Sequence, residues 1–374
     1  AYYQTRLPGP WPQQHLQQRL GEQATTDPAI GAGYAPAGWT NLVSHLRRQG
    51  VSDEEMLAAG LATTASTGRL IDRFRDRAVF PITHAGQVLG FVGRRHPDLT
   101  DEDHAGPKYL NTAQTTLFRK GDQLFGMRPD VIDAGATPVI VEGPMDAIAV
   151  TLAGHGRYVG VAPLGTALTE EQADQLAQLG RHPIVATDSD LAGQLAAHRD
   201  FWLLAQHGMD PTVASFPDGA DPADLLTNQG AHTLVQTLQA ARTLSEVLLT
   251  KRLANLTGDD AITAAADVLA AGSPTRWDGG CQQVAAQLPA QLGQVRSALA
   301  RAARAWSADP RAVVSEQLSQ MTQVRARIAQ AAATATTPPE QRWIPLADQI
   351  DSRLSRQGDW PSLAAILQQA HDAG

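Results

Sequence analysis

Before residue 130 the apolar positions come in short runs separated by turn residues. Residues 78–83 and 88–92 form two such runs of β type. Ala85-Gly86 lies between them, and this spacing predicts an antiparallel hairpin.

Two short helices are predicted ahead of this hairpin. Ser52-Asp-Glu-Glu55 has the form of a capping box and predicts a helix that ends at Gly60. Thr40 is placed to cap another helix that ends at Gly50. Helices and a hairpin together indicate an α+β fold for this part of the chain.

Between residues 131 and 230 apolar runs alternate with helical patterns. The runs are continuous, as in buried parallel strands, and they cover residues 138–141, 158–161, 183–186 and 212–216. Helical patterns cover residues 144–153, 169–179 and 191–207, the second of them opening with the capping box Thr169-Glu-Glu-Gln172. Short connections between alternating elements predict right-handed crossovers and a parallel sheet.

From residue 231 the chain is rich in Ala, Gln and Leu, with helical periodicity throughout. Breaks are predicted at Gly258, at residues 272–274 and at Asp309-Pro310. Residues 334–345 have the composition of a linker, and a last helix is predicted after it. We therefore expect three parts: an α+β domain over residues 1–130, an α/β domain over 131–230 and an all-helical region over 231–374.

Composition narrows the class of protein. Hydrophobic residues make up 43% of the 374 residues, which is typical of a folded globular chain. No uninterrupted apolar run has the ~18 residues that a membrane helix needs, so we expect a soluble, cytoplasmic protein with no membrane partner. Cys281 is the single cysteine, which excludes an internal disulfide and a cysteine-based zinc site.

The net charge of −8 is unevenly distributed along the chain. Residues 131–230 hold 3 basic and 13 acidic residues, whereas the segments on either side each have a net charge of +1. Six arginines fall between residues 69 and 95, and only three of the 30 basic residues are lysines. Guanidinium groups suit phosphate recognition, so the basic cluster is a candidate nucleic-acid surface.

Pairs of carboxylates follow three of the predicted strands: Glu142 and Asp146, Asp188 and Asp190, and Asp221 and Asp224. Because the carboxyl ends of parallel strands meet at one edge of a sheet, these six acids are expected to converge there. Carboxylate oxygens are the ligands that Mg²⁺ prefers, and two such ions can clamp an in-line phosphoryl transfer.

Each acid also has a simpler interpretation. An Asp at a strand-to-helix junction is often only a helix N-cap, and an acidic segment is often only a solvated surface. Three pairs in order, each after a predicted strand, favour a shared metal site over three separate caps.

These motifs carry a resemblance to a known family. Glu142-Gly-Pro-Met-Asp146, Leu164-Gly-Thr-Ala-Leu-Thr169, Asp188-Ser-Asp-Leu-Ala-Gly193 and Asp221-Pro-Ala-Asp224 resemble a Toprim domain, and more closely the catalytic core of DnaG-type bacterial primases. The N-terminal block is similar to the same family at Asp72-Arg-Phe-Arg-Asp-Arg77, Gly90-Phe-Val-Gly-Arg94, Lys108-Tyr-Leu-Asn111 and Leu117-Phe-Arg-Lys-Gly121. The resemblance covers roughly residues 15–230 and implies a basic α+β subdomain, a Rossmann-like Toprim domain and a helical C-terminal region.

The resemblance also implies roles for particular residues. The carboxylates of the Toprim motifs would bind two or more Mg²⁺ or Mn²⁺ ions, with Glu142, Asp188 and Asp190 catalytic. In this family the last motif is usually Asp-Pro-Asp, whereas here Ala223 follows the proline and the acid is displaced to Asp224. The basic subdomain would guide template and nucleotide phosphates through Arg19, Arg73, Arg75, Arg77, Arg94, Lys108, Tyr109, Asn111 and Lys120. Tyr109 and Phe118 are candidates for stacking on bases.

The implied activity is template-directed synthesis of short RNA primers on single-stranded DNA, with nucleoside triphosphates as substrates and a replicative helicase as a further partner. DnaG-type primases also have an N-terminal zinc ribbon, which a chain with one cysteine does not hold, so no zinc is expected in this chain. Two alternatives stay open: a Toprim metal-dependent nuclease, and a catalytically degenerate module that binds single strands or a helicase.

Overall fold

The computed structural model describes residues 1–100, 103, 106–165, 167–187, 191–217, 219–288 and 290–333. Asp188, Asp190 and the predicted linker lie outside these ranges. The chain divides into two compact units. The first consists of Ala1–Leu164 with Asp221–Gln236, and the second of Gly165–Ala220 with the chain from Thr237 onward. The mixed α+β and α/β fold class and the helical C-terminal region are confirmed.

The basic part of the first unit is built on a four-stranded sheet in the order β1-β4-β5-β6. The central hairpin pairs β4 (Arg77–His84) with β5 (Gln87–Arg95), as predicted. Ala85 and Gly86 both have positive φ, 48° and 76°, which is the backbone of a tight turn that follows the twist of the strands. The short strands β1 (Gly33–Ala35) and β6 (Tyr109–Asn111) complete the sheet on either side.

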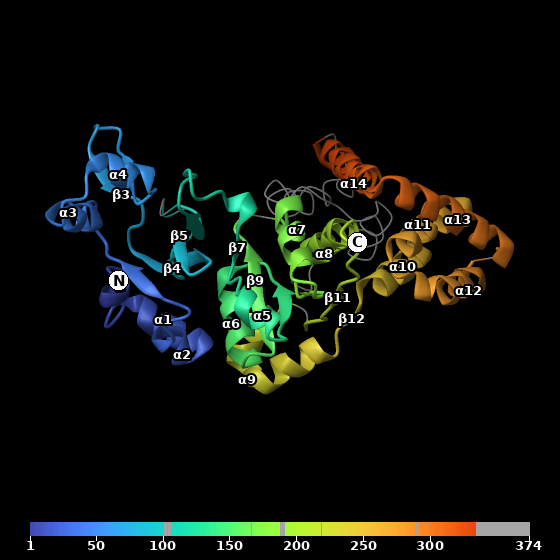
Figure 1. Ribbon diagram of the computed structural model, residues 1–374, viewed down its shortest axis with the longest axis horizontal. Helices are drawn as coiled ribbons and strands as arrows, with labels where there is room; N and C mark the ends of the chain where they lie inside the picture. The colour runs from blue at the N-terminus through green and yellow to red at the C-terminus, as the bar shows by residue number, and fades with distance from the viewer. Residues whose placement is uncertain are drawn as a thin grey trace. The chain divides into compact units, whose positions relative to one another are not determined.

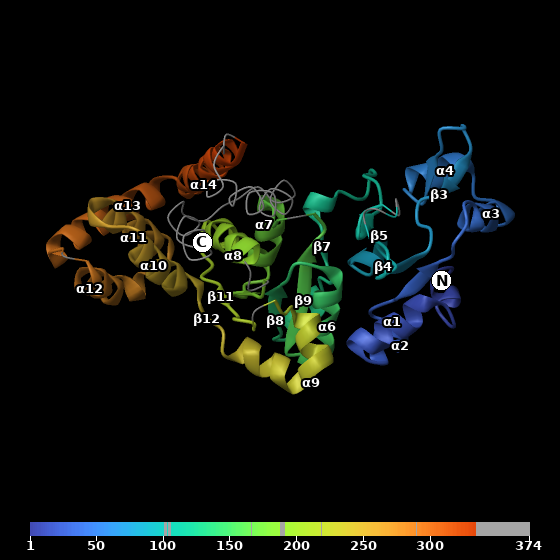
Figure 2. The same cartoon turned by 180° about the vertical axis from the view of Figure 1, so that it is seen from behind.

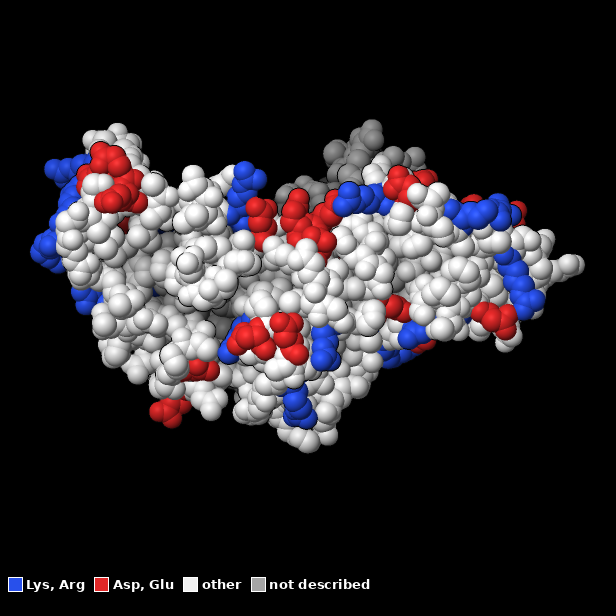
Figure 3. Space-filling model, in the orientation of Figure 1, with Lys and Arg blue, Asp and Glu red and all other residues white. Residues whose placement is uncertain are grey.

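Helical segments of the first 58 residues accompany this sheet in the first unit (Figure 1). They are η1 (Gln4–Arg6), α1 (Trp11–Leu20), α2 (Gln23–Thr26), α3 (Asn41–Arg48) and α4 (Asp53–Ala58). The capping box of α4 is confirmed, because the Ser52 hydroxyl accepts from the Glu55 amide and the Glu55 carboxylate accepts from the Ser52 amide. In Figure 3 basic and acidic side chains gather over α3 and α4, in agreement with the basic last turn of α3 and the acidic first turn of α4.

The predicted cap of α3 is wrong. The Thr40 side chain makes no capping hydrogen bond. Instead Asp72, at the end of β3 (Leu70–Asp72), accepts from the amides of Leu42 and Val43 at 2.8 and 2.9 Å. β3 itself pairs with β2 (Ala62–Thr64) in a separate two-stranded ribbon. The helix is therefore capped by a residue about thirty positions along the chain, which a local pattern does not reveal.

The remainder of the first unit holds the start of the parallel sheet. β8 (Thr137–Ile140) and β9 (Tyr158–Pro163) are parallel, and α6 (Pro144–Gly154) connects them. β7 (Leu124–Phe125) adds an antiparallel strand to β9, and α5 (Pro129–Asp133) precedes β8. α9 (Pro222–Gln239), which bends at Gly230, follows later in the chain, and both views show its first turns beside α6 (Figures 1 and 2).

The second unit begins with α7 (Glu170–Gln178), β10 (Ile184–Val185), α8 (Leu191–Ala205) and β11 (Thr212–Val213). β10 and β11 are parallel, as predicted, and α7 opens with its predicted capping box. β12 (Arg242–Thr243) pairs antiparallel with β11. The sequence analysis predicts neither this strand nor β7, because Arg242-Thr243 is polar and the two apolar residues of β7 stand between Gln123 and Gly126.

The helical region contains α10 (Leu244–Asn255), α11 (Gly258–Ala271), η3 (Pro274–Arg276), α12 (Trp277–Gln287), α13 (Leu292–Ala308) and α14 (Pro310–Ala333). Breaks fall at the three predicted places, and a further one, between α12 and α13, was not predicted from the sequence. None of the described helices is long and apolar enough to cross a membrane.

Candidate functional site

Asp146, Asp221 and Asp224 lie at the starts of two helices of the first unit, α6 and α9, and act on the same guanidinium, that of Arg19. Asp146 lies in the first turn of α6 and is 8% exposed. Its Oδ1 accepts from the Ala223 amide, in the first turn of α9, at 3.3 Å. Glu142 is exposed two residues before α6. Asp146 thus contacts the start of α9, whereas Asp188 and Asp190 lie outside the described residues, and the convergence of all six acids stays a prediction.

Asp221 and Asp224 stand at the start of α9 and have partners within the protein. Asp221 Oδ1 accepts from the Asp224 amide at 2.6 Å, which is an N-cap contact. Arg19, from α1, places Nη1 2.5 Å from Asp224 Oδ1 and Nη2 3.9 Å from Asp221 Oδ1. The Arg19 guanidinium therefore offsets part of the negative charge of this pair of carboxylates and ties α1 to α9.

The oxygen donors are of the right type for a hard divalent cation, but they do not form a complete site in the described residues. No three His, Cys, Asp or Glu side chains of the described part of the chain are close enough together to hold a metal ion. Glu142 and Asp146 are suitable ligands by chemistry.

Tyr109, in strand β6 of the basic sheet, lies close to Asp146 at the start of α6. A Cβ built on Gly143 would lie 3.3 Å from Asp146 Oδ2 and 3.7 Å from the Tyr109 hydroxyl, so Tyr109 and Asp146 line the same turn. Burial raises the pKa of Tyr109 to about 12; the Arg94 charge opposes this shift and the Asp146 charge adds to it. The phenol is therefore neutral at physiological pH and supplies hydrogen bonds rather than charge.

Arg94 is the cross-strand neighbour of Tyr109 in the β5–β6 pair. Its charge acts on the Tyr109 phenol, and its Nη1 lies 2.7 Å from His15 Nε2. Its Nε is buried without a hydrogen-bond partner, and within the described chain no carboxylate pairs with it. Arg94 thus keeps a full positive charge beside the carboxylate corner, as a phosphate ligand requires.

Guanidinium groups also line a pocket of about 500 Å³ in the basic part. Its walls include Trp39 and four arginines: Arg73, Arg75, Arg77 and Arg95. Trp39 is 64% exposed, and the Arg75 guanidinium lies over its ring at 4.7 Å. An exposed ring beside several cations suits a single nucleic-acid strand, because bases stack on the ring while phosphates meet the cations.

The backbone holds most of these arginines in place. Arg73 Nη2 donates to the Asn111 carbonyl at 2.9 Å, and Arg75 Nη1 donates to the Asp72 carbonyl. Arg77 is 3% exposed and donates to the carbonyls of Gly93 and Pro107. Burial, together with the charges of the neighbouring Arg95, Arg75 and Arg73, lowers the pKa of Arg77 to about 10. Such crowding of like charges is relieved when an anion binds.

Several predicted residues have a role that differs from the predicted one. Arg77 is too buried to contact a nucleic-acid strand. Its hydrogen bonds to backbone carbonyls stabilise the β-sheet instead. Phe118 is 1% exposed, so the prediction that it stacks on bases is wrong. The Asn111 side-chain amide donates to the Leu164 carbonyl just after β9. Lys108 is exposed, with Nζ 5.8 Å from the centre of the Tyr109 ring, and Lys120 is exposed in η2 (Lys120–Asp122).

Sequence reasoning missed His15, Trp39 and Arg95 as site residues. Arg95 follows Arg94 in β5, so the two side chains point to opposite faces of the sheet. The alternation of side chains along a strand could therefore have identified Arg95 as a residue of the other face. Trp39 has no helical or strand pattern around it, and its exposure shows only in the folded chain. His15 is identified only by its contact with Arg94, 79 positions away.

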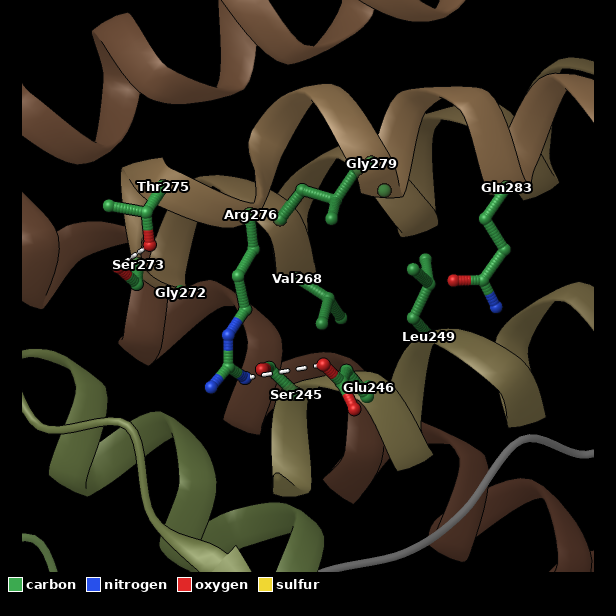
Figure 4. A pocket seen from close by; sticks show the side chains of 12 residues that line it. Ser245, Glu246, Leu249, Val268, Gly272, Ser273, Thr275, Arg276, Gly279 and Gln283 are labelled. Carbon is green, nitrogen blue, oxygen red and sulfur yellow. Dashed lines mark hydrogen bonds and ion pairs between the residues drawn. The ribbon is translucent and has the colours of Figure 1, made fainter. Parts of the chain in front are cut away.

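A second pocket, of about 240 Å³, lies among α10, α11 and α12 (Figure 4). Arg276 points to Glu246, with Nη1 3.5 Å from Oε1, and lies 3.3 Å from Asp210 Oδ2. Two carboxylates therefore neutralise this guanidinium, in contrast to Arg94, and the pocket lacks the free charge that a phosphate needs.

Comparison with known proteins agrees with this geometry. The family model of the DNA primase catalytic core, N-terminal domain, matches residues 2–130, and a Toprim-like model matches residues 139–226. The DNA primase of Clostridium acetobutylicum is 34% identical over 229 residues, and that of Deinococcus radiodurans is 41% identical over 230. These matches cover 61% and 60% of this chain but 37% and 38% of the relatives. The chain thus spans less than half the length of these relatives.

Solved structures match over most of their length. The RNA polymerase domain of Mycobacterium tuberculosis primase DnaG is 32% identical, with a TM-score of 0.66 over 76% of this chain and 94% of that one. A DNA primase domain from Pseudomonas aeruginosa is 28% identical, with a TM-score of 0.66 over 80% and 96%. A DnaG primase catalytic domain bound to single-stranded DNA gives a TM-score of 0.60 at 28% identity, over 81% and 92%. The corner of carboxylates, the basic sheet beside it and these matches together show that the chain belongs to the DnaG family of DNA primases, whose catalytic core it contains.

Proposed function

We propose that this chain synthesises short RNA primers on single-stranded DNA by nucleotidyl transfer. The observation that carries the proposal is the junction in the first unit, where Arg94 and Tyr109 of the basic sheet meet the start of α6 at Asp146. A nucleotidyl-transfer site needs fixed carboxylates and an uncompensated cation within reach of one triphosphate. The relatives named DNA primase support the same activity.

The carboxylates would hold Mg²⁺ or Mn²⁺. When bound, such an ion lowers the pKa of the attacking 3′-hydroxyl and offsets charge on the triphosphate. Glu142 and Asp146, with Asp188 and Asp190, are the residues that would bind two or more ions. The Ala223 amide holds Asp146 in place. We leave Asp224 out of this set because Arg19 engages its carboxylate, and we assign Asp221 to the cap of α9.

The Trp39–Arg75 pocket would take the template. Its exposed ring and crowded guanidinium groups suit stacking and phosphate contacts, and a related catalytic domain has been solved bound to single-stranded DNA. A helicase partner stays a prediction from the family resemblance alone.

A direct test incubates the chain with unprimed single-stranded DNA, labelled ribonucleotides and Mg²⁺ or Mn²⁺. We expect short new oligonucleotides that disappear in Glu142→Gln, Asp188→Asn and Asp190→Asn. Arg47→Ala is a matched control, because Arg47 pairs with Asp53 on the surface away from this corner, and its product should equal that of the wild type. Cleavage of the DNA without nucleotide addition would favour a nuclease instead. Metal-independent binding without chemistry on a primed template would favour the degenerate module.

The template pocket is tested separately by binding. Arg75→Ala and Trp39→Ala should each weaken binding of a labelled single strand, by roughly tenfold for the stacking residue. Arg75→Ala should also reduce the salt dependence of binding, since each lost phosphate contact lowers the slope by about one. Equal affinities and slopes for Arg75→Ala and Arg47→Ala would contradict the assignment.

A further inference from the structure

Arg94 differs from Arg19 in the charge of its partners. Two carboxylates, Asp224 and Asp221, surround Arg19 and neutralise it. The partners of Arg94 are the imidazole of His15 and the phenol of Tyr109. Both arginines lie in one unit. Helix α1 carries Arg19 itself and, one turn before it, His15, which contacts Arg94.

His15 is neutral where it meets Arg94. Burial, together with the charges of Arg94 and Arg19, lowers the pKa of His15 to about 4. A neutral imidazole offers one ring nitrogen as an acceptor, and Nε2 lies 2.7 Å from Arg94 Nη1. His15 therefore orients the guanidinium without cancelling its charge.

The first turn of α1 is anchored so that His15 stays in place. Trp11 donates from Nε1 to Asp76 Oδ1 at 2.8 Å, and its ring packs against that of His96 at a tilt of 58°, with 4.6 Å between centroids. The Trp11 and His15 rings are 6.1 Å apart. Asp76 also accepts from the Tyr34 hydroxyl at 2.8 Å. The helix that carries His15 is thus fixed to the basic sheet at its N-terminal end.

We propose that His15 is a positioning residue. It orients the Arg94 guanidinium toward a phosphate group of the substrates and does not neutralise the positive charge of Arg94. The inference rests on the proposed function for the identity of that phosphate, which belongs either to the nucleoside triphosphate or to the template strand. A carboxylate at position 15 would hold Arg94 equally well but would neutralise it. An aliphatic side chain would leave the charge but would release the guanidinium.

Three variants of the full chain separate these effects: His15→Gln keeps a neutral acceptor, His15→Glu adds a charge and His15→Leu removes the acceptor. Gln14→Glu is the matched control, because it makes the same change of charge at an exposed position of α1. Affinity for labelled ATP and for a labelled single strand is measured separately at pH 7.5, with primer synthesis and thermal unfolding alongside.

We expect His15→Gln and Gln14→Glu to bind within about twofold of the wild type, and His15→Glu and His15→Leu to bind one ligand roughly tenfold more weakly. Weaker ATP binding alone assigns the phosphate to the nucleotide, and weaker binding of the strand alone assigns it to the template. In synthesis assays a loss of nucleotide affinity raises KM more than it lowers kcat.

The proposal is overturned if His15→Glu binds both ligands as the wild type does, or if His15→Gln is as weak as His15→Leu. A fall in melting temperature with unchanged affinities would also overturn it, because the role of His15 would then be structural. Failure of the proposed function would look different from failure of this proposal. The wild type would then synthesise no primer, whereas the binding measurements would still compare the His15 variants.

Discussion

At the scale of single residues, Gly160 decides how closely α6 packs on β9. A Cβ at this position would lie 2.2 Å from the Ala147 carbonyl oxygen and 2.5 Å from its Cα. Both are backbone atoms of the helix that carries Asp146, so neither can move aside alone. The absence of a side chain at Gly160 therefore allows the approach that places α6 at the end of the parallel strands.

Gly160→Ala should lower the free energy of unfolding by about 1–3 kcal/mol, as overpacking of a tight contact does. Gly279→Ala is the matched control, because nothing lies within 4 Å of a Cβ there and the residue is inside α12. Alanine favours helix, so that variant should be neutral or slightly more stable. Equal melting temperatures for the two variants would contradict the close approach.

Residue type alone did not assign roles within the arginine cluster. Arg75 and Arg77 are two positions apart and equally basic, yet Arg75 lies over an exposed ring while Arg77 is buried against backbone carbonyls. Phe118 and Trp39 differ in the same way, one in the core and one exposed. Burial depends on what the rest of the chain places around a residue, so no pattern in the cluster itself distinguishes these cases.

At the scale of elements, the β4–β5 hairpin was predictable because its signals are local. Two β-type runs separated only by Ala85-Gly86 predict a two-residue hairpin turn. The two strands pair antiparallel, as expected. Ala85 nevertheless has φ of 48°, a left-handed conformation that is unfavourable for alanine.

Ala85→Asn should stabilise the hairpin by about 0.5–1 kcal/mol, because Asn-Gly is the preferred sequence for this turn. Urea unfolding should show a higher midpoint with an unchanged slope. Ala85→Val is the control with the opposite expectation. Positive φ is unfavourable for a β-branched residue, so this variant should have a lower urea midpoint than the wild type. A lower midpoint for Ala85→Asn would contradict the turn geometry.

At the scale of the whole molecule, one side chain ties the α/β part of the second unit to its helical region. Arg252 of α10 donates to the Ala264 carbonyl of α11 at 2.6 Å and to Gln317 Oε1 of α14 at 2.9 Å. It also lies 5.3 Å from the centre of the Trp202 ring of α8. Burial lowers the pKa of Arg252 to about 10, which Asp267 opposes. The Arg252 guanidinium thus connects α10, which carries it, with α8, α11 and α14.

Arg252→Ala should reduce the stability of the second unit by about 2–4 kcal/mol, because it leaves several partly buried acceptors without a donor. Arg296→Ala is the control, since Arg296 pairs with Asp278 on the surface of the helical region and contributes less than about 1 kcal/mol. The two variants can be compared by thermal unfolding followed through tryptophan fluorescence. Similar melting temperatures would show that the network does not join these helices.

By itself the sequence determined the order and type of most elements, because hydrophobic period, capping boxes and Gly or Pro breaks act within a few residues of the structure that they specify. It also placed acids after the strands, which indicated a carboxylate corner. Which partner each charged group finds was decided only in the folded chain. Arg19 meets Asp224, Arg94 meets His15 and Asp72 caps α3, all across long stretches of sequence. Such contacts depend on distances in space that local patterns do not encode, and they separate the arginines that keep their charge for a ligand from those that only support the fold.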